Sequence, residues 1–141
     1  MKLSEALLVR AQMEQTFSLA ASSMSSDEII SSRVLCKPWK PGKHNAGEIY
    51  AAADQVWYCI QGYDNAIYPD IKPENAAWNT FHKPYHGTTP DTAMPWVQPT
   101  GAHDIYLAGE YMVWTDGLIY RCVINTNYSP ADYAPAWEIA G

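Results

Sequence analysis

Charged residues are scarce in this sequence, and it has none of the runs typical of membrane or nucleic-acid-binding proteins. Only 17% of the 141 residues are charged, and the formal net charge is −6. A negative chain without a basic run is repelled by a phosphate backbone, which argues against a nucleic-acid partner. No apolar run approaches the roughly 20 residues that span a membrane, and the first residues lack a signal-peptide core. We therefore expect a soluble protein, made in the cytoplasm, that does not bind membranes.

Cysteine is also rare, with three residues, Cys36, Cys59 and Cys122. An odd count argues against a closed disulfide framework. Cys59 and Cys122 occupy matching positions in an internal repeat described below. We interpret them as small buried core residues rather than a bridge or a reactive thiol.

Motifs of known catalytic or metal chemistry are absent. The sequence has no glycine-rich phosphate loop, no nucleophile elbow and no string of metal ligands. His82 and His86 have the spacing of a metal pair on a helix, but Pro84 and Gly87 argue against a helix there. Acidic residues are scattered, and two minimal modules leave little room for a glycosidase cleft. We predict a protein without catalytic residues, metal or cofactor that is not an enzyme.

Aromatic residues and proline are abundant, with 10 tyrosines, 6 tryptophans and 10 prolines. The clearest element is the stretch from 109 to 123, where two β-prone runs flank Asp116-Gly117. Asp-Gly suits a two-residue type I′ turn, which predicts a hairpin with Trp114 opposite Ile119. In that register Trp114 lies on the face opposite Tyr120.

A second copy of this unit lies upstream, with matching landmarks roughly sixty residues apart in the same order. The landmarks of the first copy are Pro38-Trp39, Ala46-Gly47-Glu48, Val56 to Ile60 and Ala77-Trp78, and those of the second are Pro95-Trp96, Ala108-Gly109-Glu110, Ile119 to Val123 and Ala136-Trp137. The sequence therefore predicts a mainly β chain: an N-terminal helical arm over 1–32, a first β module over 33–80, a linker over 81–95 and a second module over 96–141.

The N-terminal arm has apolar residues at helical spacing from Met1 to about Met24, including Leu3, Leu7, Met13 and Phe17. One interpretation is a helix that folds back on the β modules. The other is an assembly helix that forms a dimeric or trimeric coiled coil or inserts into a larger particle. Downstream, Ser25 and Glu28 form a capping box that predicts a short second helix before Ile29-Ile30.

The surplus of aromatics suggests a shallow saccharide-binding surface. Tyrosine and tryptophan rings stack on the C–H face of a pyranose, while nearby Asn, Asp and Ser hydrogen-bond its hydroxyls. The tryptophans that bracket each module are better explained as core, as are Trp57 and Tyr120. The remaining candidates for sugar contact are Tyr106, Trp114, Tyr128 and Tyr133.

The second copy resembles the small chitin-binding-type carbohydrate-binding modules. The residues that carry this resemblance are Trp96, Tyr106, Gly109, Glu110, Val113, Gly117, Tyr120, Cys122 and Trp137. The tandem arrangement, the helical start and the stretch PYHGTTPDTAMPWVQPTGAHD also resemble short proteins from tail gene clusters of phages and prophages of Gram-positive hosts. The resemblance implies a three-stranded antiparallel sheet in each module. The first copy departs from the pattern, since it has Asp54 in place of the turn glycine, and this favours a structural copy that no longer binds sugar.

The function implied is that of a tail-associated virion protein, made in the host cytoplasm, whose second module contacts host cell-surface polysaccharide. Its N-terminal helix would bind other virion proteins, and the chain could act as a homotrimer or a homodimer. The alternative is a purely structural capsid or tail decoration protein that binds no sugar. A weaker alternative is a wall-degrading enzyme.

Overall fold

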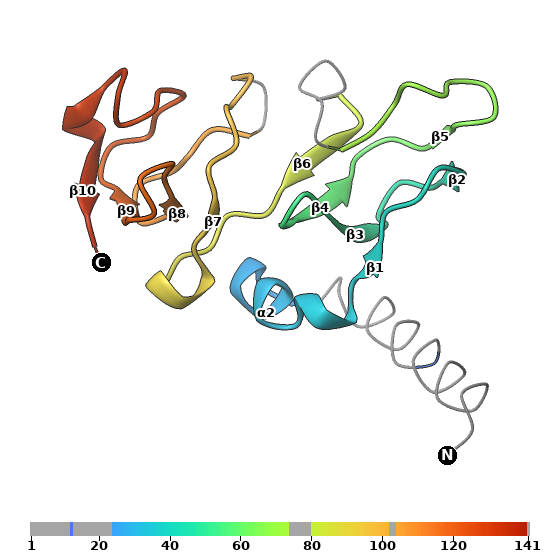
Figure 1. The fold of residues 1–141 in the computed structure, drawn as a ribbon, viewed down its shortest axis with the longest axis horizontal. Coiled ribbons are helices and arrows are strands. Elements are labelled where there is room, and N and C mark those ends of the chain that lie inside the picture. Colours follow the sequence, from blue (N-terminus) through green and yellow to red (C-terminus); the bar gives the residue numbers. More distant parts are fainter. Residues whose placement is uncertain (1–11, 13–23, 74–79, 102–103, 141) are drawn as a thin grey trace.

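A computed structural model describes residues 12, 24–73, 80–101 and 104–140 (Figure 1). This part of the chain is mainly β, with short strands in several small sheets and a minor helical part, as the sequence predicts at that level. Among these residues no helix is long and apolar enough to cross a membrane. The predicted N-terminal helix, with Leu3, Leu7, Met13 and Phe17, lies outside the described residues.

The helix α2 (Ser26–Ser31) begins where the capping box predicts. The Ser25 hydroxyl accepts a hydrogen bond from the Glu28 backbone N–H at 3.2 Å, and the Glu28 carboxylate accepts one from the Ser25 N–H at 3.4 Å. Ile29 and Ile30 are buried, and a 3-10 turn, η2 (Arg33–Leu35), follows. The capping box prediction is confirmed.

The first module contains a four-stranded sheet in the order β1-β3-β4-β6. Its strands are β1 (Lys37–Pro38), β3 (Ile49–Ala52), β4 (Gln55–Cys59) and β6 (His82–Pro84). β1 runs parallel to β3, and the other pairs are antiparallel. A separate ribbon joins β2 (Lys43–His44) to β5 (Tyr63–Asp64).

The second module repeats this sheet in the order β7-β8-β9-β10. Its strands are β7 (Met94–Pro95), β8 (Tyr111–Val113), β9 (Ile119–Cys122) and β10 (Trp137–Ile139). β7 is parallel to β8 and the other pairs are antiparallel, while a single bridge from Tyr106 to Thr126 stands where the first module has its ribbon. The two modules therefore share one topology, and each has a parallel edge strand beyond the three antiparallel strands that the resemblance implies.

The stretch 81–95 is not a free linker. It contains β6, the edge strand of the first sheet, then η4 (Pro90–Thr92), then β7, the edge strand of the second. Between them Gly87 accepts a hydrogen bond from the Tyr111 N–H at 2.9 Å, and a Cβ on Gly87 would lie 2.1 Å from the Thr92 carbonyl oxygen. The prolines that suggested a loop are tolerated because Pro84 and Pro95 lie in edge strands.

Backbone hydrogen bonds align the two copies residue by residue. Gly47 N–H donates to Cys59 O at 2.8 Å, as Gly109 N–H does to Cys122 O at 2.8 Å. The closing landmark of the first copy is different from the prediction. Trp137 pairs with Cys122, but the residue that pairs with Cys59 is His82, and Trp78 lies outside the described residues.

The predicted register of the second hairpin is wrong by one residue. Met112 pairs with Tyr120 and Val113 with Ile119, so the loop has three residues, Thr115-Asp116-Gly117. Gly117 has a φ of 82°, and its N–H donates to Trp114 O at 3.0 Å, which is the geometry of a turn followed by a left-handed glycine. Trp114 therefore lies on the same face as Tyr120.

The first hairpin, in contrast, closes with a two-residue turn. Ala53 and Asp54 have φ values of 52° and 60°, the positive values of a type I′ turn, and Ala52 pairs with Gln55. The second copy has one more residue between Gly109 and Cys122 than the first copy has between Gly47 and Cys59. This extra residue lies in the hairpin loop.

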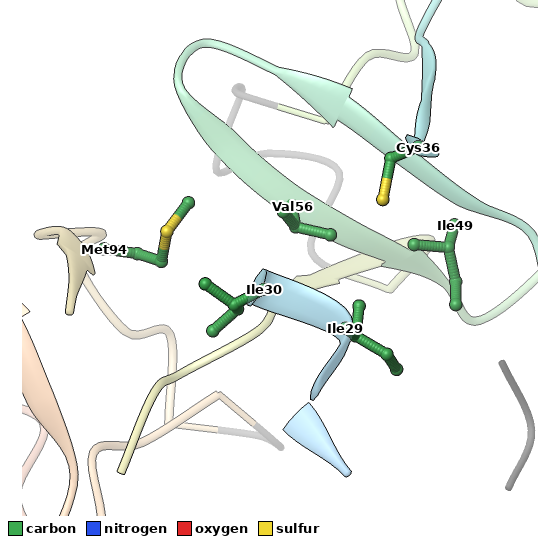
Figure 2. Close-up of a cluster of buried hydrophobic side chains, with 6 residues drawn as sticks. All are labelled: Ile29, Ile30, Cys36, Ile49, Val56 and Met94. Carbon is green, nitrogen blue, oxygen red and sulfur yellow. The ribbon is translucent and has the colours of Figure 1, made fainter. Parts of the chain in front are cut away.

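Three buried clusters hold the fold together. The junction core combines α2, the first sheet and β7, and contains Ile29, Ile30, Cys36, Ile49, Val56 and Met94. Figure 2 shows Ile29 and Ile30 facing the first sheet, with Met94 of the second module beside them. The first core contains Tyr50, Trp57, Cys59, Tyr63 and Ile71, and the second core contains Tyr106, Met112, Cys122, Ala136 and Trp137. All three cysteines are buried and lie outside any disulfide, and for Cys59 and Cys122 burial is the predicted state.

Candidate functional site

Tyr106, one of the predicted sugar contacts, is a core residue with an exposed fraction of 1%. Its ring is stacked between Trp96, at 5.0 Å between centroids, and His86, at 3.8 Å. Its hydroxyl accepts a hydrogen bond from the Val97 N–H at 3.2 Å, and burial raises its pKa. The prediction that Tyr106 offers its ring to a ligand is wrong, because both faces are covered.

Trp114 also differs from the prediction. Because of the three-residue loop, its ring lies on the inner face and packs against the second core, with a T-shaped contact to Trp96 at 5.5 Å. It is only partly exposed. Trp114 therefore packs against the second core and does not lie on the outer face of the hairpin.

Tyr128 and Tyr133 are exposed, and the structure brings them together. Their exposed fractions are 60% and 44%. Both line a shallow hollow of about 270 Å³ on the second module. Its other lining residues are Ile105, Asn125, Thr126 and Asn127. Two of the four predicted contact residues thus form one surface with two asparagines.

The loop that carries the two tyrosines is held by its own hydrogen bonds. The Ser129 carbonyl accepts from the Asp132 N–H at 3.1 Å and the Tyr133 N–H at 2.8 Å. The indole N–H of Trp137 donates to Tyr128 O at 2.9 Å, and the Tyr128 N–H donates to the Thr126 hydroxyl at 2.9 Å. The backbone under both rings is therefore fixed before any ligand binds, which lowers the entropic cost of binding.

The asparagines of the hollow join it to the neighbouring loop. Asn125 accepts a hydrogen bond from the Ala108 N–H through Oδ1 at 2.8 Å, and Gln98 Nε2 donates to Asn127 O at 2.9 Å. The Asn127 Oδ1 atom is buried and has no hydrogen-bond partner. Flat tyrosine faces beside amide groups are the two kinds of contact that a pyranose ring requires.

Sequence reasoning missed Ile105, Asn125 and Asn127 as parts of this surface. Ile105 lies on a different segment and reaches the hollow because its neighbour Tyr106 forms an isolated bridge with Thr126. A one-residue bridge leaves no periodic pattern in the sequence, so only the equivalence with the β2–β5 ribbon of the first module could have indicated it.

The first module also exposes a pair of large side chains on a loop, Ile67 and Tyr68, with exposed fractions of 68% and 59%. Tyr63, which the sequence suggests is exposed, is instead buried in the first core.

The first core is a polar aromatic network rather than a reactive site. The Trp39 indole N–H donates to the Tyr63 hydroxyl at 2.7 Å, and that hydroxyl lies 2.8 Å from His82 Nε2. Burial, with a smaller contribution from His44, lowers the pKa of His82 to about 4, so the imidazole is neutral at pH 7 and is hydrogen-bonded to the Tyr63 hydroxyl through Nε2. Tyr63 and His82 are buried, Trp39 is half-buried, and the three side chains contact one another, which is a packing role.

The cysteine thiols and the histidine pair give no further reactive group. Burial raises the pKa of Cys122 to about 11, so its thiol stays protonated and donates to Ile124 O at 3.0 Å. His82 contacts Tyr63, whereas His86 Nδ1 lies 3.1 Å from Glu110 Oε1 in the second module. Within the described ranges no group of three or more His, Cys, Asp or Glu side chains could hold a metal ion.

No protein-family model matches the chain, and a search of the curated proteins found no relative. The hollow of the second module and its surroundings are therefore the features that bear on function.

Proposed function

We propose that this chain is a tail-associated virion protein of a phage or prophage, with two carbohydrate-binding-type modules, of which the second contacts host cell-surface glycan. It is made in the host cytoplasm and joins the particle through its N-terminal helix, which binds other virion proteins, as a homotrimer or homodimer. It needs no cofactor and is not an enzyme.

The observation that carries this proposal is the hollow with Tyr128 and Tyr133. A monomeric β module buries most of its large aromatics, so two exposed rings on one hydrogen-bonded loop favour a contact surface. The hollow is shallow and open, which suits a chain of sugars better than a small molecule that must be enclosed.

The arrangement of the elements supports attachment to the particle on one side of the molecule and glycan contact on the other. In Figure 1 the segment that precedes β10 lies at the upper edge, whereas α2 lies at the lower edge. The described chain continues from Met24 into α2, and Met24 packs against the junction core. A particle that holds the residues before Met24 would thus leave the tyrosine loop uncovered.

Retention on insoluble glycan tests the proposal. We expect the intact chain to be retained on colloidal chitin or purified host cell wall, and the Tyr128→Ala/Tyr133→Ala variant to bind at least tenfold more weakly, a loss of about 1.4 kcal/mol or more. The control variant is Val34→Ala, which alters a side chain that is 69% exposed on η2, beside α2. The proposal fails if the intact chain is not retained, or if the double variant binds as well as the control.

The alternative, a purely structural capsid or tail decoration protein, is favoured by a different observation. Leu107, Ile124 and Ile139 of the second module are exposed by 45%, 50% and 62%. Such side chains would be covered by a neighbouring subunit in an assembled particle. Solvent protection of these residues and of Tyr133 in purified virions, together with no glycan retention, would establish this second function.

A further inference from the structure

We infer that the first module carries a second glycan contact at Tyr68, so that one chain binds a neutral polysaccharide through both modules at once. This inference rests on the proposed function. It departs from the interpretation that the first copy is purely structural, which depended on Asp54 in place of the turn glycine.

The two modules contain the same loop turn, and in each it ends on an exposed tyrosine. In the first module the Asp64 carbonyl accepts from the Ile67 N–H at 3.0 Å and the Tyr68 N–H at 2.9 Å. In the second the Ser129 carbonyl accepts from the N–H groups three and four residues later, the latter belonging to Tyr133. Tyr68 is therefore the counterpart of Tyr133, although the residues between the cysteine and the turn differ in number.

Tyr68 is exposed, yet the backbone that carries it is anchored in the protein. Asn65, which is 8% exposed, donates through Nδ2 to Tyr68 O at 2.9 Å and to Ile71 O at 3.0 Å. Its Oδ1 accepts from the Gly42 N–H at 3.1 Å. A buried amide that uses both ends to hold one loop fixes the position of the ring, as the Trp137 indole does for Tyr128 in the second module.

Both tyrosine loops lie along the same side of the molecule. In Figure 1 the green segment after β5 and the red-orange segment before β10 lie along the upper edge, and α2 lies along the lower edge. The junction core joins α2, the first sheet and β7, so the two modules are held in this arrangement. A single extended polymer can therefore reach both loops.

The charge of the loops defines the class of polymer. Asp70 and Asp132 are exposed beside the two tyrosines, and the chain has a formal net charge of −6. These carboxylates repel a phosphate-rich or uronic-acid polymer. The surface fits a neutral or N-acetylated polysaccharide, in which ring stacking and hydroxyl contacts do not require a cation.

Two modules on one polymer give avidity, which is the measurable consequence. The second contact becomes intramolecular, and the gain over one contact is commonly 10²–10⁴-fold. The test compares the full chain with Tyr68→Ala, Tyr133→Ala and the Val34→Ala control on colloidal chitin, and titrates each with the soluble trimer of N-acetylglucosamine. Thermal unfolding checks that every variant folds.

We expect two trimers to bind each wild-type chain, and one trimer to bind each chain of either tyrosine variant. Retention on chitin falls at least tenfold in Tyr68→Ala and is unchanged in Val34→Ala. If Tyr68→Ala is retained like the wild type and the wild type binds a single trimer, the inference is overturned and the proposed function stands. If the wild type binds neither chitin nor the trimer nor host wall, both are overturned. Stronger retention on an anionic wall polymer than on chitin would overturn the assignment of the polymer class.

Discussion

In the first module β6 places His82 opposite Cys59, whereas in the second module β10 places Trp137 opposite Cys122. The surroundings differ accordingly. His82 is hydrogen-bonded to Tyr63 within a network of polar rings, while Trp137 packs edge-on against Tyr106 at 5.3 Å and Trp96 at 6.0 Å. One topology thus encloses a hydrogen-bonded core in one copy and a stack of apolar rings in the other.

The backbone frame is what the two copies share. In each, the N–H of the cysteine donates to the carbonyl of the glutamate that follows the glycine, Glu48 at 2.8 Å and Glu110 at 2.7 Å. Each of these carboxylates also lies near a histidine, at 3.4 Å from His44 Nδ1 and 3.1 Å from His86 Nδ1. Strand pairing and the glycine–glutamate corner therefore define the module, and different ring chemistry can fill its core.

Replacing Trp137 by histidine, the residue at the matching position of the first module, should have the largest effect on stability. We expect Trp137→His to lower the free energy of unfolding by about 3 kcal/mol or more, because a large buried ring is replaced by a smaller polar one. The variant also loses the hydrogen bond from the indole to Tyr128 O, which holds the tyrosine loop. Urea denaturation followed by tryptophan fluorescence measures the change, and a loss below about 1 kcal/mol would contradict the packing described for the second core.

Acid should destabilise the first module through His82. The second module has Trp137, which does not titrate, at the matching position. Burial lowers the pKa of His82 to about 4 from its ordinary value of 6.5, so the unfolded chain binds a proton that the folded chain does not. Stability from this group is therefore complete above pH 6.5 and falls as the pH decreases toward 4, by on the order of 3 kcal/mol in total.

The variant His82→Gln removes the titrating imidazole, and its amide can either accept a hydrogen bond from the Tyr63 hydroxyl or donate one to it. Subtracting the stability of the variant from that of the wild type at each pH between 4 and 7 should leave a difference that shrinks as the solution is acidified. A difference that does not vary with pH would show that His82 is protonated equally in the folded and unfolded chains.

The hydrogen bonds between α2 and the segment before β7 should make an intermediate contribution to the stability of the fold. Asp27 accepts hydrogen bonds at 2.6 Å from both the Thr88 N–H and the Thr92 hydroxyl. Partial burial acts to raise the pKa of Asp27, but these hydrogen bonds outweigh it and lower the pKa. We expect Asp27→Ala to cost about 2 kcal/mol at pH 7, measured by thermal unfolding, with Glu28→Ala as a neighbouring acidic control that affects only the cap.

The cost of Asp27→Ala should shrink in acid. Because the folded pKa is depressed, the stabilisation by the carboxylate is present at neutral pH and is lost as the pH falls through that lowered value. An Asp27→Ala cost that stays the same at low pH would mean that the hydrogen bonds do not depend on the ionised carboxylate.

The hairpin turns should give the smallest effects, with opposite signs in the two modules. Ala53 has a φ of 52°, so Ala53→Gly should stabilise the first hairpin by up to about 1 kcal/mol. Gly117 has a φ of 82°, so Gly117→Ala should destabilise the second by about 1 kcal/mol. Thermal unfolding of the two variants side by side measures both, and equal signs would show that one of the two positions does not have a positive φ.

Local signals predicted the elements that depend on a few neighbouring residues. The capping box at Ser25, the hairpin at Asp116-Gly117 and the copied frame from Gly47 to Cys59 are all confirmed as elements. The register of the second hairpin was not predictable from these residues, because Asp-Gly fits a three-residue loop with a left-handed glycine as well as a two-residue turn. A two-residue turn places Trp114 on the face opposite Tyr120, whereas the observed three-residue loop places both on the same face.

The remaining errors concern contacts between distant segments. Tyr106 is enclosed by His86 and Trp96, which come from another part of the chain. No periodic pattern in the sequence predicts such a stack. The edge strands inside 81–95 were hidden because proline and histidine there resemble a loop. The exposure of Tyr128 and Tyr133 is predictable because a loop rich in tyrosine and proline cannot bury every ring, whereas the position of Ile105 depends on the fold.

The most direct test of glycan contact is an NMR titration of the full chain with the N-acetylglucosamine trimer, with selectively labelled tyrosines. The account predicts that the ring signals of Tyr128, Tyr133 and Tyr68 shift, while those of the buried Tyr106 and Tyr50 stay in place. Unchanged signals for Tyr128 and Tyr133 at saturating trimer, and with solubilised host wall fragments, would contradict it.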